Sequence, residues 1–276
     1  MQRILIFDSG VGGLSVCDAI VAAGLALEID YAADNAWLPY GDKSDDALRA
    51  RVPTLLAALT HRLQPDLIVM ACNTASTIAL DTARAIIAPP IVGVVPPIKP
   101  AAELTRTGTI ALLATPATVT RPYTDGLIAQ FASGKRVIRY GSTKLVEAAE
   151  AKLAGESADP AAIGDAIAHL FGAEGGGAID VIALACTHFP LLRAELEEAA
   201  PRECAWLDSG AAIARRVGAL LNLAPGGAQT RTRASLFTAL EHAPRAALEA
   251  RGFTSFAAIG EAPTFDVAHI AAAGTD

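Results

Sequence analysis

The chain alternates between short, mostly apolar runs and longer segments whose apolar residues recur with helical spacing. In the first third, the apolar runs predict buried strands at residues 4–7, 28–34, 67–71 and 90–95. The segments between them predict one helix from Leu14 and further helices over 45–63 and 74–87. This order favours a parallel β-sheet with helices on both faces.

The pattern starts again after residue 108. Strands are predicted at 109–115, 135–140 and 181–185, and helices at 144–152 and from Ala161 onward. In both halves an early strand leads into a polar loop, and a later strand ends at a cysteine. We interpret this as a degenerate internal duplication, which predicts an α/β protein with two similar domains and parallel-type sheets. Further on, residues 248–256 predict a helix followed by a strand-like or loop segment.

The two cysteine motifs are the most informative feature of this pattern. MACNTAS places Cys72 at the end of one apolar run, and LACTHFP places Cys186 at the end of another. The loops at Asp8 and Thr115 also follow strand ends. Because ligands of open α/β sheets bind beyond the carboxyl ends of the strands, two facing domains would bring all four loops to one cleft. We therefore expect one site with a thiol on either side.

Composition and charge narrow the classes of function. Hydrophobic residues make up 52% of the 276 and charged residues 18%, which is enough apolar material for a sizeable core. The net charge of −7 and the low aromatic content argue against a nucleic-acid partner. The apolar stretches are shorter than the ~20 residues of a membrane span, and the N-terminus lacks signal-peptide features. We expect no membrane association and a cytoplasmic location.

The four cysteines do not form a disulfide or zinc pattern. Cys17, Cys72, Cys186 and Cys204 show no C-x-x-C spacing. Neither motif cysteine has a second ligand at a metal-site spacing, since His188 lies only two residues after Cys186, so we expect no metal. Free cysteine is commonly a core residue, and we expect this of Cys17 and Cys204.

The matched pair of thiols favours proton transfer over nucleophilic catalysis. A nucleophilic cysteine usually works with one activating histidine. Two matched cysteines with one neighbouring histidine suit stereoinversion, in which one removes a proton from a carbon and the other returns a proton to the opposite face. Both cysteines precede segments that could begin helices, and the positive end of a helix dipole would favour the thiolate. Neighbouring Asn73, Thr74 and Thr187 can hold carboxylate and ammonium groups.

Plainer interpretations compete for several residues. The glycines of DSGVGG (residues 8–13) could form a tight turn with positive φ, or a phosphate cradle, although the G-x-G-x-x-G order and the P-loop lysine are missing. Asp8 could be an N-cap, His188 a structural histidine and PYG (39–41) an ordinary turn. Other functions also stay open: a one-thiol decarboxylase or hydrolase, and a non-catalytic amino-acid-binding protein.

Six segments, in this order and spacing, resemble the glutamate racemase family of the aspartate/glutamate racemase superfamily. They are FDSGVGGLSV, YAADNAWLPYGDKS, ACNTAS, LLATPATV, ACTHFPLL and LDSGAAIARRV, and the resemblance runs from about Ile4 to Val217. The resemblance implies two α/β domains related by a pseudo-two-fold axis, with the active site in the cleft between them. It implies a first domain of residues 1–98 plus 207–276 and a second of 99–206. Aspartate and hydantoin racemases are alternatives within the same fold.

The resemblance also implies a reaction and its setting. The family interconverts L-glutamate and D-glutamate without cofactor or metal, and supplies D-glutamate for peptidoglycan in the bacterial cytoplasm. The implied partner is the small-molecule substrate glutamate, and we allow for a homodimer.

Roles carry over from the family to matching positions. Cys72 resembles the cysteine that deprotonates D-glutamate and Cys186 the one that deprotonates L-glutamate, with Asp8 and His188 as auxiliary residues near the thiols. Glu147 resembles a glutamate near the second-domain site, although a solvated helix face is an equal alternative for it. Ala185 departs from the glycine common at its position. The positions matching substrate-binding residues are Asp8, Ser9, Tyr40, Gly41, Asn73, Thr74, Thr115, Thr118, Thr187 and His188.

Overall fold

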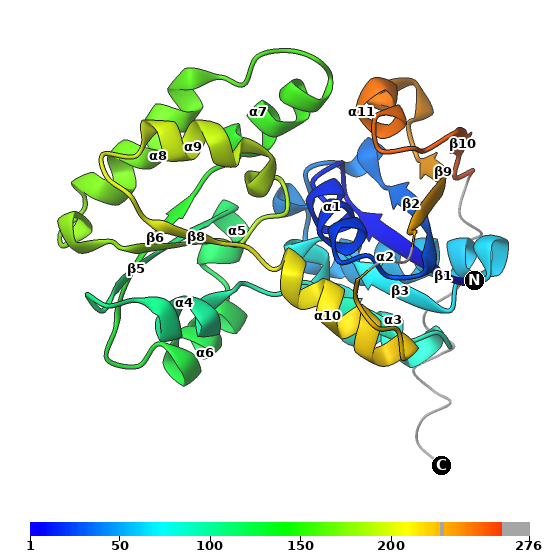
Figure 1. Cartoon of the computed structure of the whole chain (residues 1–276), viewed down its shortest axis with the longest axis horizontal. Coiled ribbons are helices and arrows are strands. Elements are labelled where there is room, and N and C mark those ends of the chain that lie inside the picture. Colours follow the sequence, from blue (N-terminus) through cyan, green and yellow to red (C-terminus); the bar gives the residue numbers. More distant parts are fainter. Residues whose placement is uncertain (227–228, 261–276) are drawn as a thin grey trace.

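The computed structural model describes residues 1–226 and 229–260, and its framework is a pair of parallel β-sheets (Figure 1). Within this described part, the first sheet has six strands in the order β10-β9-β2-β1-β3-β4. They are β1 (Gln2–Asp8), β2 (Leu27–Ala33), β3 (Leu67–Met70), β4 (Ile91–Gly93), β9 (Arg231–Phe237) and β10 (Ser255–Ala258). Each pairing in this sheet is parallel, so the carboxyl ends of the strands meet at one edge.

The second sheet repeats the strand order of the first. Its strands in the described chain lie in the order β6-β5-β7-β8 and are also parallel. They are β5 (Thr109–Ala114), β6 (Arg136–Gly141), β7 (Val181–Leu184) and β8 (Ala205–Leu207). The order β6-β5-β7-β8 matches β2-β1-β3-β4, as an internal duplication requires. The predicted α/β architecture with two parallel sheets is therefore confirmed.

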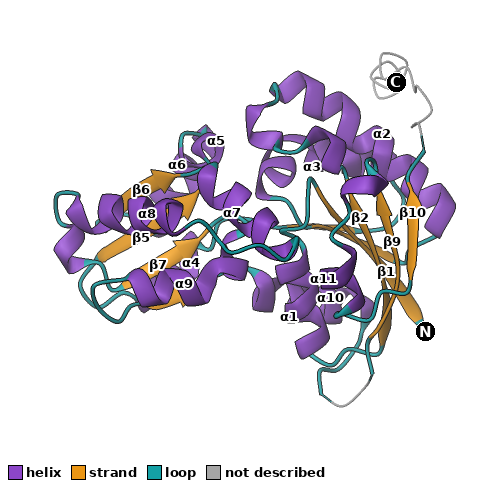
Figure 2. Ribbon diagram, turned by 90° about the horizontal axis from the view of Figure 1, so that it is seen from above, coloured by secondary structure: helices purple, strands orange, loops and turns teal. Residues whose placement is uncertain are grey.

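Helices cover both faces of each sheet (Figure 2). The helices packed around the first sheet are α1 (Leu14–Ala22), α2 (Asp45–Leu63), α3 (Asn73–Ile86), α10 (Gly210–Leu221) and α11 (Arg245–Glu249). Those around the second are α4 (Ile98–Leu104), α5 (Pro116–Val119), α6 (Pro122–Phe131), α7 (Lys144–Leu153), α8 (Pro160–Gly172) and α9 (Arg193–Ala199).

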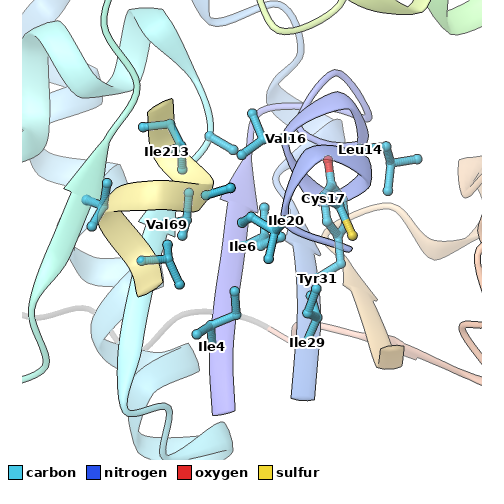
Figure 3. Close-up of a cluster of buried hydrophobic side chains, with 14 of the residues drawn as sticks. Ile4, Ile6, Leu14, Val16, Cys17, Ile20, Ile29, Tyr31, Val69 and Ile213 are labelled. Atoms are coloured by element: carbon cyan, nitrogen blue, oxygen red, sulfur yellow. The ribbon is translucent and has the colours of Figure 1, made fainter. Parts of the chain in front are cut away.

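Alternation along β1 explains the two cores of the first sheet. Ile4 and Ile6 point to the face covered by α1 and α10, where Cys17 is buried among them (Figure 3). Leu5 and Phe7 point to the opposite face, against α2 and α3. Because side chains of a strand alternate between faces, an apolar residue at every position places the strand between two helical layers.

The predicted elements lie where the sequence placed them, but further elements were not predicted, among them helices α4, α6 and α9. The short strand β8 and the longer β9 were not predicted. In β9, Arg233 donates to Glu28 at 2.9 Å across the sheet, so a strand with polar positions is stabilised by a cross-strand ion pair that periodicity does not reveal. The segment 248–256 contains the end of α11, a loop and the start of β10, as expected.

The division into domains stays a prediction. Leu207 pairs with Ala183 in the second sheet, whereas α10 packs on α1 and β9 pairs with β2 in the first. A return to the first domain directly after Leu207 fits these pairings. Residues 261–276 of the predicted first domain lie outside the described residues. Among the helices that the structure describes, none combines the length and apolar character needed to cross a membrane.

Candidate active site

A pocket lies where strands of both sheets end, and it contains both motif cysteines. Cys72 follows β3 and Cys186 follows β7, which occupy equivalent places in the two sheets. The pocket encloses about 340 Å³, and each cysteine is only 6% exposed. Its lining residues are Ser9, Leu38, Pro39, Tyr40, Gly41, Cys72, Asn73, Thr74, Thr115, Val146, Ala185, Cys186, Thr187 and His188. A site with a thiol from each sheet is therefore present.

Cys72 lies in surroundings that favour the protonated thiol. It is the N-cap residue of α3, and its sulfur lies 3.6 Å from the Ser9 hydroxyl. Burial raises the pKa of Cys72 well above its usual range, and the neighbouring Asp8 carboxylate raises it further. The Ala75 backbone amide opposes this shift but does not outweigh it. The helix N-terminus expected at this cysteine is present.

Cys186 has different surroundings, and the expectation of a helix at this thiol is wrong. After Cys186 the chain turns through a short 3₁₀ segment, Phe189–Leu192, before α9 begins at Arg193. No α-helix dipole acts on this sulfur from the chain that directly follows. Instead, Nδ1 of His188 lies 3.8 Å from the Cys186 sulfur. A charged imidazole in that place directs an N–H donor toward the Cys186 sulfur.

Glu150 on α7 keeps His188 charged. Oε1 of Glu150 lies 2.7 Å from Nε2 of His188, which is 3% exposed. Burial by itself lowers the pKa of His188, but its hydrogen bonds to Cys186 and Glu150 reverse this and raise the pKa well above 6.5. Burial likewise tends to raise the pKa of Glu150, but the bond to His188 brings it below 4.5. Both shifts indicate an imidazolium–carboxylate pair.

A different glutamate of α7 from the one considered in the sequence lies beside His188. Glu147 is exposed, outside the pocket lining, whereas Glu150, one helical turn further on, reaches His188. The solvated-face alternative for Glu147 fits its exposure.

The glycines of the DSGVGG loop make room for this pair. Gly10, Gly12 and Gly13 are absent from the positive-φ glycines of the described chain, so the strained-turn interpretation is wrong for them. A Cβ at Gly12 would collide with Nδ1 of His188, and one at Gly10 with Oε1 of Glu150. These glycines therefore permit the second sheet's residues to approach the backbone that follows β1.

The amides of the same loop are already occupied by carboxylates. Asp8 accepts hydrogen bonds from the backbone N–H groups of Ser9 and Gly13, and Glu150 accepts one from Val11 at 3.0 Å. A phosphate cradle needs such amides free, so this arrangement argues against one. The N-cap of α1 is Gly13, so Asp8 binds amides before the helix and at its cap without being the N-cap residue.

Asp8 lies fully buried behind the pocket wall. Burial raises its pKa, while His188 and the amides of Ser9 and Gly13 act in the opposite direction. The Thr187 hydroxyl donates to its Oδ2 at 3.4 Å. Asp8 thus contacts residues that line the pocket from both sheets.

The other predicted substrate-binding residues divide into two groups. Ser9, Tyr40, Gly41, Asn73, Thr74, Thr115, Thr187 and His188 line the pocket. Thr118 does not; it is fully buried and its hydroxyl lies 2.9 Å from that of Thr115. The PYG segment is more than an ordinary turn, because all three of its residues line the pocket. In the described structure, Oδ1 of Asn73 is buried with no hydrogen-bond partner, which leaves an acceptor for a ligand donor.

Ala185 was noted from the sequence, whereas the rest of the apolar wall was not. Leu38, Val146 and Ala185 line the pocket beside the thiols. Within the described ranges there is no group of three or more His, Cys, Asp or Glu side chains arranged to hold a metal ion.

Comparisons with known proteins agree with this geometry. The family model for Asp/Glu/hydantoin racemases matches residues 9–217. Glutamate racemase of Sphingopyxis alaskensis is 55% identical over 217 residues, which cover 79% of this chain and 81% of the relative. Glutamate racemase of Vibrio cholerae is 47% identical over 221 residues, covering 80% and 81%.

Solved structures extend the similarity to the fold. The structure of Escherichia coli glutamate racemase in complex with L-glutamate and the activator UDP-MurNAc-Ala matches with a TM-score of 0.84 and 40% identity, covering 93% of this chain and 97% of that one. Glutamate racemase from Thermus thermophilus in complex with β-chloro-D-alanine matches with a TM-score of 0.72 and 30% identity, covering 92% and 95%. The chain therefore belongs to the glutamate racemase family of the Asp/Glu/hydantoin racemases, a family of isomerases.

Proposed function

We propose that this protein interconverts L-glutamate and D-glutamate, with Cys72 and Cys186 as its two acid–base groups. The observation that carries the proposal is that two thiols line one pocket from equivalent strand ends of two similar sheets. The curated relatives at 47–55% identity are glutamate racemases, and the E. coli relative was solved with L-glutamate. These support glutamate over aspartate or a hydantoin as the substrate.

The proposed reaction moves one proton off Cα and another onto it. With L-glutamate, the Cys186 thiolate removes the Cα proton and the C–H electron pair stays on carbon as a carbanion. The Cys72 thiol then donates its proton to the opposite face, which gives D-glutamate and leaves Cys72 as the thiolate and Cys186 as the thiol. The reverse reaction begins at Cys72. His188, paired with Glu150, holds a positive charge beside the Cys186 thiolate.

The surroundings of the thiols suit this sequence of steps. The burial that keeps Cys72 protonated supplies an acid, while His188 favours a base at Cys186. General acid–base catalysis contributes about 10²–10⁴-fold, so donors around the carbanion must supply much of the remaining acceleration. The hydroxyls of Thr74, Thr115 and Thr187 are our candidates, and the burial of these side chains limits competition from water.

We further propose roles for the remaining polar wall. Ser9 and Asn73 hold the amino group, the backbone N–H groups of Tyr40 and Gly41 bind a carboxylate, and Asp8 supports the Cys72 side. The reaction needs no cofactor. We propose that the protein acts in the cytoplasm and supplies D-glutamate for peptidoglycan. We propose a homodimer as its assembly. We propose one domain of residues 1–98 plus 207–276 and a second of residues 99–206.

The test compares two cysteine variants with a matched control. Wild type, Cys72→Ala, Cys186→Ala and Cys204→Ala are incubated with each glutamate enantiomer, and optical rotation is followed. Cys204 is half-exposed and lies outside the pocket, so its variant should keep full activity. Both pocket variants should lose racemisation. If only one of them does, a one-thiol reaction replaces the proposal, and if aspartate reacts while glutamate does not, the substrate is wrong.

A further inference from the structure

A buried carboxylate outside the pocket wall connects α2 to that wall. Asp34 follows β2 and is fully buried. Arg51 on α2 donates to both of its oxygens, from Nε at 2.6 Å and from Nη2 at 2.8 Å. The Tyr40 hydroxyl donates to Oδ2 of the same carboxylate at 2.7 Å. The three side chains therefore form one connected group.

Arg51 is itself held in one orientation. Its guanidinium lies 4.2 Å from the ring centre of Trp37, and its side chain is 26% exposed. Bidentate pairing and stacking both use the planar guanidinium, which a lysine cannot reproduce. Arg51 thus fixes the Asp34 carboxylate from a 19-residue helix, the longest in the described chain.

Tyr40 brings this group to the pocket. It is 1% exposed and lines the pocket next to Gly41. Since its hydroxyl is bound to Asp34, the position of its ring depends on where that carboxylate is held. Gly41, the next residue, lies near the start of α5 in the second half of the chain: a Cβ on it would be 3.9–4.0 Å from the side chains of Thr115 and Ala117. A shift of Tyr40 would therefore alter the wall where the sheets face each other.

We propose that Arg51 is a positioning residue for the substrate: through Asp34 it holds Tyr40 and Gly41 in place to bind glutamate. This rests on the proposed racemase function. Asp34 is a structural acceptor here and not a proton carrier, because both of its oxygens are used by Arg51 and Tyr40 and it is outside the described pocket lining. Because the wall binds substrate and transition state alike, its loss should act on KM more than on kcat.

The test is a double-mutant cycle with a matched control. Arg51→Gln and Tyr40→Phe should each raise KM for glutamate by roughly 10- to 100-fold, the effect of losing a hydrogen bond to a charged group, with a smaller change in kcat. The double variant should be little worse than either single one, since both break the same chain of contacts. Arg49→Gln removes the same charge from the solvent side of α2, where Arg49 pairs with Asp46, and should leave KM unchanged.

Two further variants separate positioning from folding. Arg51→Lys keeps the positive charge but lacks the planar, bidentate guanidinium, so this variant should fold and still show a KM above that of wild type. Asp34→Asn combined with Arg51→Gln avoids an unpaired buried charge if Arg51→Gln fails to fold, and it should show the same raised KM. An inactive wild type would refute the proposed function itself. An active wild type with unchanged KM in folded Arg51 variants, or with additive effects of Arg51→Gln and Tyr40→Phe, would overturn the positioning role alone.

Discussion

Replacing Glu150 by Gln tests the charge pair that prepares Cys186. The substitution keeps an oxygen that can accept the Val11 amide but removes the negative charge 2.7 Å from His188. Burial lowers the pKa of His188, and hydrogen bonds to Cys186 and Glu150 are the main interactions that raise it. The substitution weakens the second of these. We expect the His188 pKa to fall and the positive charge beside Cys186 to be held less firmly.

The structure gives the size of the effect. A hydrogen bond to a charged group contributes about 1.5–3 kcal/mol, and the 26% exposure of the Glu150 side chain places this one at the lower end. Loss of this bond should lower the pKa of His188, and about 1.4 kcal/mol corresponds to a tenfold change in rate. The catalytic efficiency on L-glutamate at neutral pH should fall by roughly tenfold.

The same pair gives a signed dependence of stability on pH. His188 has a raised pKa in the folded state, so its contribution is complete below about 6.5 and is lost as pH rises through the folded value. Glu150 has a lowered pKa, so its contribution is present above about 4.5 and is lost as pH falls through the folded value. The loss of stability in Glu150→Gln should therefore be largest between about pH 4.5 and pH 6.5.

The assay is an NMR titration of ¹⁵N-labelled histidine, with His188 assigned from the spectrum of His188→Gln. Glu147→Gln is the matched control, because Glu147 is an exposed carboxylate one turn away on α7. It should shift neither the His188 titration nor the activity. An unshifted titration in Glu150→Gln, or an equal shift in Glu147→Gln, would refute the reasoning.

Two further substitutions test the packing around the pocket. Gly12→Ala would place a methyl group against His188 and should reduce activity by about 10²-fold, because the imidazole would be displaced. Gly126→Ala is the control, since a Cβ there would meet open space, and it should keep full activity. Steady-state kinetics of the two variants test this. Ala185→Gly removes a fully buried methyl group from the wall and loosens the backbone, so urea unfolding should show a loss of about 1–2 kcal/mol while activity stays within about tenfold. Full stability of that variant, or loss of activity in a folded protein, would contradict this account.

Local pattern was enough to predict most of the fold. The predicted helix over 45–63 coincides with α2, since Ser44 caps it and its apolar positions are buried. Strand β9 was missed because its polar positions are stabilised by partners far away in the chain, such as Glu28. Such pairing is a property of the folded sheet, and periodicity within one segment does not contain it.

The residues that line the site were largely predicted from the sequence, whereas the contacts between them were not. Both thiols and most polar wall residues reach the pocket, because the strand ends that carry them meet at one place. Glu147 and Glu150 lie on one helix and look alike in the sequence; only the approach of His188 distinguishes them. The role of the loop glycines likewise depends on which side chains of the second sheet approach them.

The most direct test of the two-thiol mechanism is the isotope content of substrate and product early in the reaction. Wild type is incubated with L-glutamate in deuterated water, and both enantiomers are separated and analysed by mass spectrometry at low conversion. Because separate thiols remove and return the proton, D-glutamate should carry deuterium at Cα while recovered L-glutamate keeps protium. Equal deuterium in the two enantiomers, or protium retained in D-glutamate, would show that a single group acts on both faces and would contradict the account.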